Sequence, residues 1–230
     1  IIFADADLER AAIGALAGIF GAAGQTCIAG SRLLVQRSVV ERVVASIAER
    51  ASQVRMGDPL DPATDMGTAA NEPQFRRILA CIERAQDEGA KLVTGGQAAR
   101  GPGLENGYFV EPTVFSEVSN SMELAQEEVF GPVLAVIPFE DEEEALRIAN
   151  DSRDGLAAGV WTESLPRAMR MTRGLQAGQI WVNTYRALAV QAPFGGFKES
   201  GFGREKGEAA LNEFLATKNV MIDFSNDRRD

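Results

Sequence analysis

Segments with a helical pattern alternate with segments with a strand pattern along most of this chain. Helical patterns cover residues 7–20, a stretch that begins at Ser38, and residues 72–88, 141–150 and 165–174. Strand patterns cover residues 31–36, 91–94, 111–115, 133–139, 158–162 and 179–183. Such alternation favours an α/β fold in three layers, with a mostly parallel sheet between helices on both faces.

The C-terminal part departs from this alternation. Residues 193–203 form a glycine-rich turn, residues 205–215 have a helical pattern, and residues 217–224 alternate like an exposed or edge strand. A strand that follows so long a loop is expected to pair outside the main core. We therefore expect a C-terminal tail strand that docks elsewhere.

Composition excludes several classes of function. The 230 residues are 45% hydrophobic, which suffices for one sizeable core, and the formal net charge of -10 disfavours binding to nucleic acid or anionic membranes. No apolar run is long enough to span a bilayer. The chain has no histidine, so it cannot complete Ser-His-Asp or Cys-His catalysis. Its two cysteines suit a reducing cytoplasm and make a poor zinc site.

Cys27 is the residue whose surroundings suggest chemistry. It follows the end of the first predicted helix and lies between Gly24 and Gly30, where backbone N–H groups could stabilise an oxyanion. The alternative is a small buried thiol that packs as a hydrophobic residue. Cys81, between Leu79 and Ile82 on a helix, is expected to pack in the core.

Four motifs together resemble the aldehyde dehydrogenase superfamily. Residues 20–31 resemble its cysteine signature, and residues 127–133 resemble its glutamate-phenylalanine cofactor motif. Residues 181–183 and 193–205 resemble its closing motifs, and all four stand in the order of the family. The resemblance covers nearly all of the chain and implies the catalytic portion of such an enzyme.

The resemblance implies a covalent mechanism on a small-molecule aldehyde. Cys27 would add to the aldehyde as a thiolate and form a thiohemiacetal, and hydride would then leave to NAD or NADP. Water would hydrolyse the resulting thioester. The backbone N–H of Cys27 would form half of an oxyanion hole, and Ile28, Asn183 and Phe194 would line the substrate pocket.

The resemblance also assigns cofactor contacts. Glu128 would bind the two hydroxyls of the nicotinamide ribose, and Phe130 would flank the nicotinamide. Gln74 and Arg77 occupy positions that resemble further ribose contacts, although the family often has lysine where Arg77 stands. A surface face of the helix is the other reading of that pair.

Two further residues have competing interpretations. Glu205 resembles a glutamate proposed to relay protons from the active site, but it could equally be a first-turn carboxylate that the helix dipole favours. Arg186 could bind a substrate carboxylate at the entrance to the pocket, or it could be a solvent-facing charge.

Parts of the family's machinery are missing from the chain. No dinucleotide-binding glycine fingerprint or P-loop is present. In the family the cofactor domain, the glutamate usually assigned as general base and an oxyanion-hole asparagine precede the position of Ile1. We therefore expect a fragment of a longer parent that is inactive alone. Residues 1–196 would be the catalytic domain, and residues 197–230 would contact the missing cofactor domain and an oligomer interface.

Other functions stay open from the sequence. A CoA-acylating semialdehyde dehydrogenase would release the acyl group to CoA rather than water. A non-catalytic scaffold would keep the fold, and a histidine-free cysteine hydrolase would act without cofactor. Because the last strand of relatives joins the sheet of a partner subunit, the parent is expected to be a homodimer or homotetramer.

Overall fold

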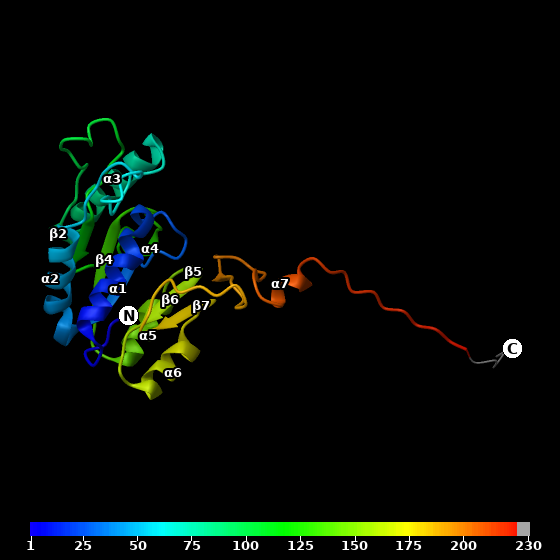
Figure 1. Cartoon of the computed structure of the whole chain (residues 1–230). Coiled ribbons are helices and arrows are strands. Elements are labelled where there is room, and N and C mark those ends of the chain that lie inside the picture. The colour runs from blue at the N-terminus through cyan, green and yellow to red at the C-terminus, as the bar shows by residue number, and fades with distance from the viewer. Residues whose placement is uncertain (225–230) are drawn as a thin grey trace.

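A four-stranded sheet forms the centre of the computed structural model, which describes residues 1–224 (Figure 1). The strand order is β1 (Arg32–Gln36), β4 (Val133–Phe139), β3 (Thr113–Ser116) and β2 (Lys91–Thr94). β4 pairs in parallel with β1 and β3, whereas β2 is an antiparallel edge strand. The sheet is therefore mostly parallel, as the alternating pattern predicts.

A second parallel pair continues the sheet beyond β1. It consists of β6 (Ala157–Val160) and β7 (Gln179–Val182). Ile2 lies between the two sheets and forms a bridge to Val35 on one side and to Trp161 on the other. Residues 1–3 thus join β1 to the end of β6.

Helices cover both faces of the sheet, and the side chains of β4 show how. Val133, Ala135, Ile137 and Phe139 belong to one buried cluster, and Leu134 and Val136 belong to the other. This alternation is expected for a strand buried on both faces. One face is covered by α1 (Leu8–Phe20) and α2 (Val40–Ala51), and the other mainly by α3 (Glu72–Asp87), α4 (Glu123–Gln126), α5 (Glu142–Asn150) and α6 (Leu165–Gly174). The three-layer α/β prediction is confirmed.

Most helices begin at a capping residue that the sequence displays. Asp7, Asn71, Asp141 and Ser164 each accept a hydrogen bond from the backbone N–H three residues later. The sequence predicts that the next helix begins at Ser38, and that start is wrong. Ser38 lies inside a 3₁₀ turn, η2 (Arg37–Val39), so α2 starts after Val39 without a side-chain cap.

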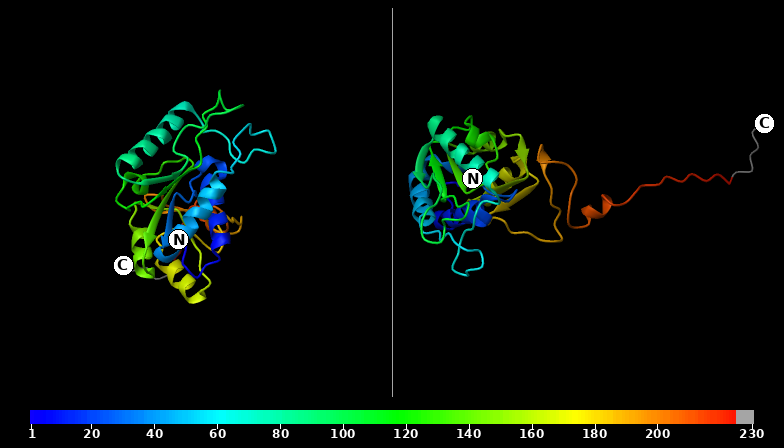
Figure 2. Two further views of the ribbon diagram at one scale, coloured as in Figure 1. Left: turned by 90° about the vertical axis from the view of Figure 1, so that its left-hand side faces the viewer. Right: turned by 90° about the horizontal axis from the view of Figure 1, so that it is seen from above.

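The C-terminal region differs from its prediction. The expected helix over 205–215 shrinks to α7 (Ala209–Asn212), because Lys206 and Gly207 have φ of 62° and 58°, which no right-handed helix accepts. Residues 217–224 form no strand, and this segment extends away from the body beyond α7 (Figures 1 and 2). A strand needs an edge to pair with, and the segment reaches none here. Residues 225–230 of the predicted 197–230 segment lie outside the described residues.

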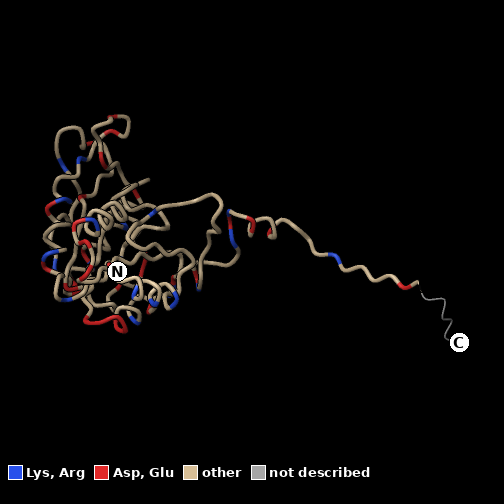
Figure 3. The backbone as a smooth tube through the Cα atoms, turned by 60° about the horizontal axis from the view of Figure 1, so that its bottom comes forward, with Lys and Arg blue, Asp and Glu red and all other residues tan. Residues whose placement is uncertain are grey.

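Small elements and surface charge complete the fold. β5 (Asp154–Gly155) pairs antiparallel with β8 (Phe197–Lys198), and the 3₁₀ turn η1 (Gly21–Gly24) follows α1. Acidic and basic positions lie close together over much of the body (Figure 3), as in the Arg170–Glu142 ion pair. Among residues 1–224, no helix is long and apolar enough to cross a membrane.

Candidate active site

The loop that carries Cys27 begins with an unusual turn. Ala22, Ala23 and Gly24 have φ of 56°, 53° and 70°, three left-handed residues in a row that begin one residue after the end of α1. This conformation is sterically strained for alanine, so the surrounding contacts must hold the turn in place. The loop then presents Cys27 as an exposed, free thiol, while the next residue, Ile28, is buried at 7% exposure and anchors the loop.

Gln25 fixes this loop to the segment that precedes α3. Its Nε2 donates a hydrogen bond to the carbonyl of Thr68 at 3.1 Å, and its Oε1 accepts one from the N–H of Ala70 at 2.7 Å. One side chain therefore satisfies a backbone acceptor and a backbone donor. The cysteine loop and the start of α3 are held together.

Gly24 brings the same loop against the chain after Phe130. A Cβ on Gly24 would stand 1.9 Å from the carbonyl oxygen of Gly131. Only glycine permits so close an approach, and it also tolerates the positive φ. The cysteine motif and the glutamate-phenylalanine motif, about a hundred residues apart, therefore touch through their backbones.

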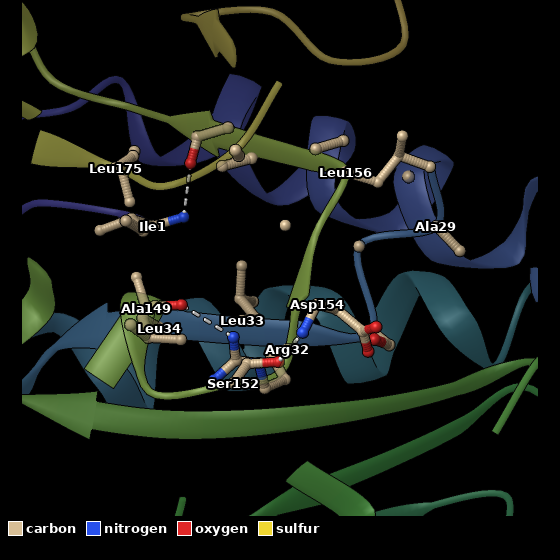
Figure 4. A pocket seen from close by; sticks show the side chains of 18 of the residues that line it. Ile1, Ala29, Arg32, Leu33, Leu34, Ala149, Ser152, Asp154, Leu156 and Leu175 are labelled. Atoms are coloured by element: carbon tan, nitrogen blue, oxygen red, sulfur yellow. Dashed lines mark hydrogen bonds between the residues drawn. The ribbon is translucent and has the colours of Figure 1, made fainter. Parts of the chain in front are cut away.

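A cavity of about 440 Å³ opens beside Cys27. Figure 4 looks into it, with Ile1 and Leu175 on one side and Arg32, Leu33 and Leu34 on the other. Cys27 and Glu128 both line this cavity, so the structure brings the predicted nucleophile and the predicted ribose ligand to one space.

Glu128 is exposed on the cavity wall, and the charge of its carboxyl depends on its surroundings. Burial raises the pKa of its carboxyl above the ordinary value, and the negative charge of Asp154 adds to that rise. The positive charge of Arg77 opposes both. Asp154 also lines the cavity, together with Glu127 and Glu199, so several carboxyl groups share its wall.

Phe130, Gln74 and Arg77 meet at the turn that follows Glu128. Phe130 has φ of 55° and is followed by Gly131. Gln74 donates hydrogen bonds to the carbonyls of Val129 and Phe130, and Arg77 donates one to the carbonyl of Glu128. None of the three side chains is among those that line the cavity.

The side chain of Asn183 makes its hydrogen bonds within the fold. Its side chain accepts a hydrogen bond from the N–H of Thr162 at 3.0 Å and donates one to the carbonyl of Thr162 at 2.9 Å. It borders a separate small cavity with Asp7 and Arg10, and not the cavity that holds Cys27. Its amide thus ties the end of β7 to the end of β6.

Phe194 and Glu205 face each other away from the cavity that holds Cys27. Each N–H donates to the carbonyl of the other at 2.7 Å, which makes an isolated antiparallel bridge. The interpretation of Glu205 as a first-turn carboxylate of a helix is wrong, because that part of the chain is not helical. Glu205 is exposed.

Arg186 and Cys81 also have defined surroundings. Arg186 donates a hydrogen bond to the carbonyl of Ala17 at 3.3 Å, near the end of α1. Cys81 packs partly buried against the core, as expected, and burial raises the pKa of its thiol.

Sequence reasoning missed Asp154 and Tyr185, which both line the cavity. Asp154 precedes Gly155, a pair that usually marks a turn, so nothing local indicated that Asp154 would act on the charge of Glu128. The Tyr185 ring packs against Gly18 and Gly159, and burial raises the pKa of its hydroxyl to about 12. The one sequence feature that could have indicated this position is the aromatic ring of Tyr185, because a large ring packs well against glycines in a cavity wall.

Residues 1–224 include no group of three histidine, cysteine, aspartate or glutamate side chains that could hold a metal ion. The features that remain are an exposed thiol and a carboxylate of raised pKa on one cavity of a three-layer α/β fold. They define a candidate active site of the thiol type. The chain belongs to the aldehyde dehydrogenase family, whose model matches residues 1–220.

Curated relatives agree with this membership. The chain is 50% identical over 222 residues to a betaine aldehyde dehydrogenase of Cereibacter sphaeroides, which covers 96% of this chain and 45% of the relative. It is 44% identical over 224 residues to a betaine aldehyde dehydrogenase of Brucella anthropi, with 97% and 46% covered. The chain therefore spans about half the length of the curated relatives it matches.

Solved structures show the same fold. Betaine aldehyde dehydrogenase of Staphylococcus aureus in complex with NAD+ superposes with a TM-score of 0.93 at 38% identity, and covers 98% of this chain and 46% of that one. An indole-3-acetaldehyde dehydrogenase in complex with NAD+ gives a TM-score of 0.89 at 45% identity, with 93% and 43% covered.

Proposed function

We propose that this chain is the catalytic part of an NAD(P)-dependent aldehyde dehydrogenase, with Cys27 as the nucleophile. The observation that carries the proposal is that Cys27 and Glu128, from two distant motifs, line one cavity of about 440 Å³. The cavity has room for a small aldehyde next to an exposed thiol. Residues 1–196 would form the catalytic domain, and residues 197–230 would contact a cofactor domain and a partner subunit.

The residues of this chain suggest a two-step reaction. The Cys27 thiolate adds to the aldehyde carbon, and the new C–S bond places the carbonyl electron pair on oxygen, where the backbone N–H of Cys27 can stabilise it. The carbon then loses a hydride and becomes a thioester. Water attacks the thioester, the carboxylic acid leaves, and the Cys27 thiol is restored.

The chain offers a fitting contact for the cofactor. A bound NAD+ or NADP+ supplies the hydride acceptor. The Glu128 carboxylate can accept hydrogen bonds from two adjacent ribose hydroxyls, and Phe130 follows it in a turn that Gln74 and Arg77 hold. The NAD+ complexes of the two solved relatives support NAD+ as the first cofactor to test.

The test uses the full-length protein that carries this chain. Production of NADH or NADPH is measured with a panel of aldehydes, and betaine aldehyde comes first because the curated relatives are named for it. Cys27→Ala should lower kcat at least about a thousandfold, since no other thiol lines the cavity among the described residues. Cys81→Ala, which removes the partly buried thiol on α3, serves as the matched control and should keep normal turnover.

The outcomes separate the alternatives. Normal turnover by Cys27→Ala would exclude Cys27 as the nucleophile. An acyl-CoA product that forms only when CoA is added would identify the CoA-acylating reaction, and ester hydrolysis with no cofactor-dependent oxidation would indicate a cysteine hydrolase. A protein that binds no cofactor and oxidises no aldehyde in the panel would favour the scaffold.

A further inference from the structure

Two side chains of α3 hold three consecutive backbone carbonyls next to the cavity. Gln74 Nε2 donates to the carbonyl of Val129 at 3.0 Å and to that of Phe130 at 2.8 Å. An Arg77 guanidinium nitrogen donates to the carbonyl of Glu128 at 2.8 Å. All three distances are those of well-formed N–H···O hydrogen bonds.

The spacing on α3 explains why both side chains reach the same turn. Gln74 and Arg77 are three residues apart, so they lie on one face of the helix. Ile78, fully buried beside them, packs on Gly131, where an added Cβ would stand 2.6 Å from its side chain. Asn71 caps the start of α3 by accepting from the N–H of Gln74. The helix is thus a fixed support for the turn.

The turn needs such support. α4 ends at Gln126 and β4 begins at Val133, so residues 127–132 lie outside any helix or strand. Within the described chain, no backbone hydrogen bond is recorded to the carbonyls of residues 128, 129 and 130. Phe130 also has a left-handed φ of 55°, a conformation that is strained for a residue with a side chain. The side-chain donors of α3 offset this strain.

We infer that Gln74 and Arg77 are positioning residues that hold the turn of residues 128–130, so that Glu128 faces the cavity. Both amide hydrogens of Gln74 have acceptors in this turn, and neither side chain lines the cavity. The inference rests on the proposed function for its effect on the cofactor. In this role Gln74 and Arg77 do not contact the ribose directly, because they act on the cofactor through Glu128 and Phe130.

Gln74→Glu separates the two roles in the full-length protein. This variant keeps the length of the side chain and an oxygen acceptor, but it removes both donors and places oxygen against two carbonyls. If the turn is held as inferred, the KM for NAD+ should rise about tenfold or more, and kcat should change less. If Gln74 instead accepts a bond from the ribose, Gln74→Glu should leave this KM unchanged, which would overturn the inference.

Matched variants test the donor at Arg77. Arg77→Met should raise the KM for NAD+, and Arg77→Lys, which keeps a charged donor, should recover part of the loss. Arg76→Met is the control, because Arg76 is the next residue, is 76% exposed and pairs with Glu72. The rate at which iodoacetamide alkylates Cys27 should stay within about twofold in every variant, since Gln25 ties the cysteine loop to the backbone of Thr68 and Ala70, which these substitutions leave intact. Equal losses of alkylation rate and cofactor affinity would show general damage to the fold and overturn the positioning role.

Hydrogen exchange tests the inference independently of catalysis. In the full-length protein, amides of a peptide that covers residues 127–132 should exchange faster in Gln74→Glu than in wild type, whereas those of β4 should not. If the wild type oxidises no aldehyde, the proposed function fails while this comparison still decides the role of Gln74. Unchanged exchange would overturn that role even in an active enzyme.

Discussion

Two neighbours of opposite charge act on Glu128. Burial is the main cause that raises the pKa of its carboxyl above the ordinary value for glutamate, Asp154 raises it further, and Arg77 lowers it. The protonated form therefore persists to higher pH than in a glutamate that is fully surrounded by water. If the ionised carboxylate binds the ribose, cofactor affinity should fall as the pH drops through this raised pKa.

Asp154→Asn should move that fall to lower pH. The variant removes a negative charge near Glu128, so the pKa of Glu128 decreases toward its ordinary value and the carboxylate survives in more acidic solution. The measurement is the Kd of NAD+ as a function of pH in the full-length protein. Glu199→Gln is the control, because it also removes a carboxylate from the cavity wall but does not contribute to the shift of Glu128. A profile that stays in place, or moves to higher pH, would contradict the assignment.

Individual site residues could be predicted from the sequence where they belong to a motif of the family. Cys27 and Glu128 stand in motifs of the family, and the structure brings both to one cavity. Asp154 and Tyr185 have no such motif, and their positions depend on how β5 and β7 fold back on α1 and β1. Asn183 lies inside a motif, yet its amide is engaged by Thr162, a contact that no local pattern shows.

Elements with a strong local pattern were predicted closely. β4 and α6 have the predicted bounds, because one is a continuous apolar run and the other begins at a serine cap followed by proline. β5 and β8 contain two residues each and exist only because they pair with each other, so no periodicity could indicate them. The start of α2 shifted because a 3₁₀ turn follows β1 directly.

Gly24→Ala should disrupt the contact between the cysteine loop and the turn after Phe130. The added Cβ would stand 1.9 Å from the Gly131 carbonyl oxygen, and the residue would keep φ of +70°. We expect a loss of at least about 2 kcal/mol in the free energy of unfolding, together with loss of aldehyde oxidation. Urea unfolding and NADH production measure the two effects.

Gly89→Ala is the matched control for this prediction. Gly89 has φ of +93°, but a Cβ there would meet no atom within 4 Å. This variant should lose only the backbone strain of about 1 kcal/mol and keep its activity. If the two variants unfold at the same urea concentration, the close approach of Gly24 to Gly131 does not contribute to stability and the prediction is wrong.

Beyond α7, apolar side chains lie exposed on a segment that leaves the body (Figure 2). They include Phe214, Leu215, Val220, Met221, Ile222 and Phe224. Exposed apolar surface of this kind is typical of an interaction site. The tail strand that the alternating pattern predicts is not formed within this chain, and a partner's sheet edge would give it something to pair with.

Association of the full-length protein should therefore depend on this segment. Sedimentation should show a dimer or tetramer for the wild type and a smaller species for the double variant Val220→Asp/Ile222→Asp, because two charges would enter the interface. Asn219→Asp, a nearby exposed position, should keep the assembly. An unchanged mass for the double variant would exclude the segment from the interface.

The junction at residues 1–3 has a consequence for the cavity. Ile2 exchanges backbone hydrogen bonds with Leu34 and Gln36, and Ile1 and Phe3 do so with Trp161. Leu33 and Leu34 of β1 line one wall of the cavity, and Ala157 to Gly159 of β6 line the facing wall. The two walls belong to different ladders that this short segment connects. The width of the space beside Cys27 therefore depends on where these three residues hold the two ladders relative to each other.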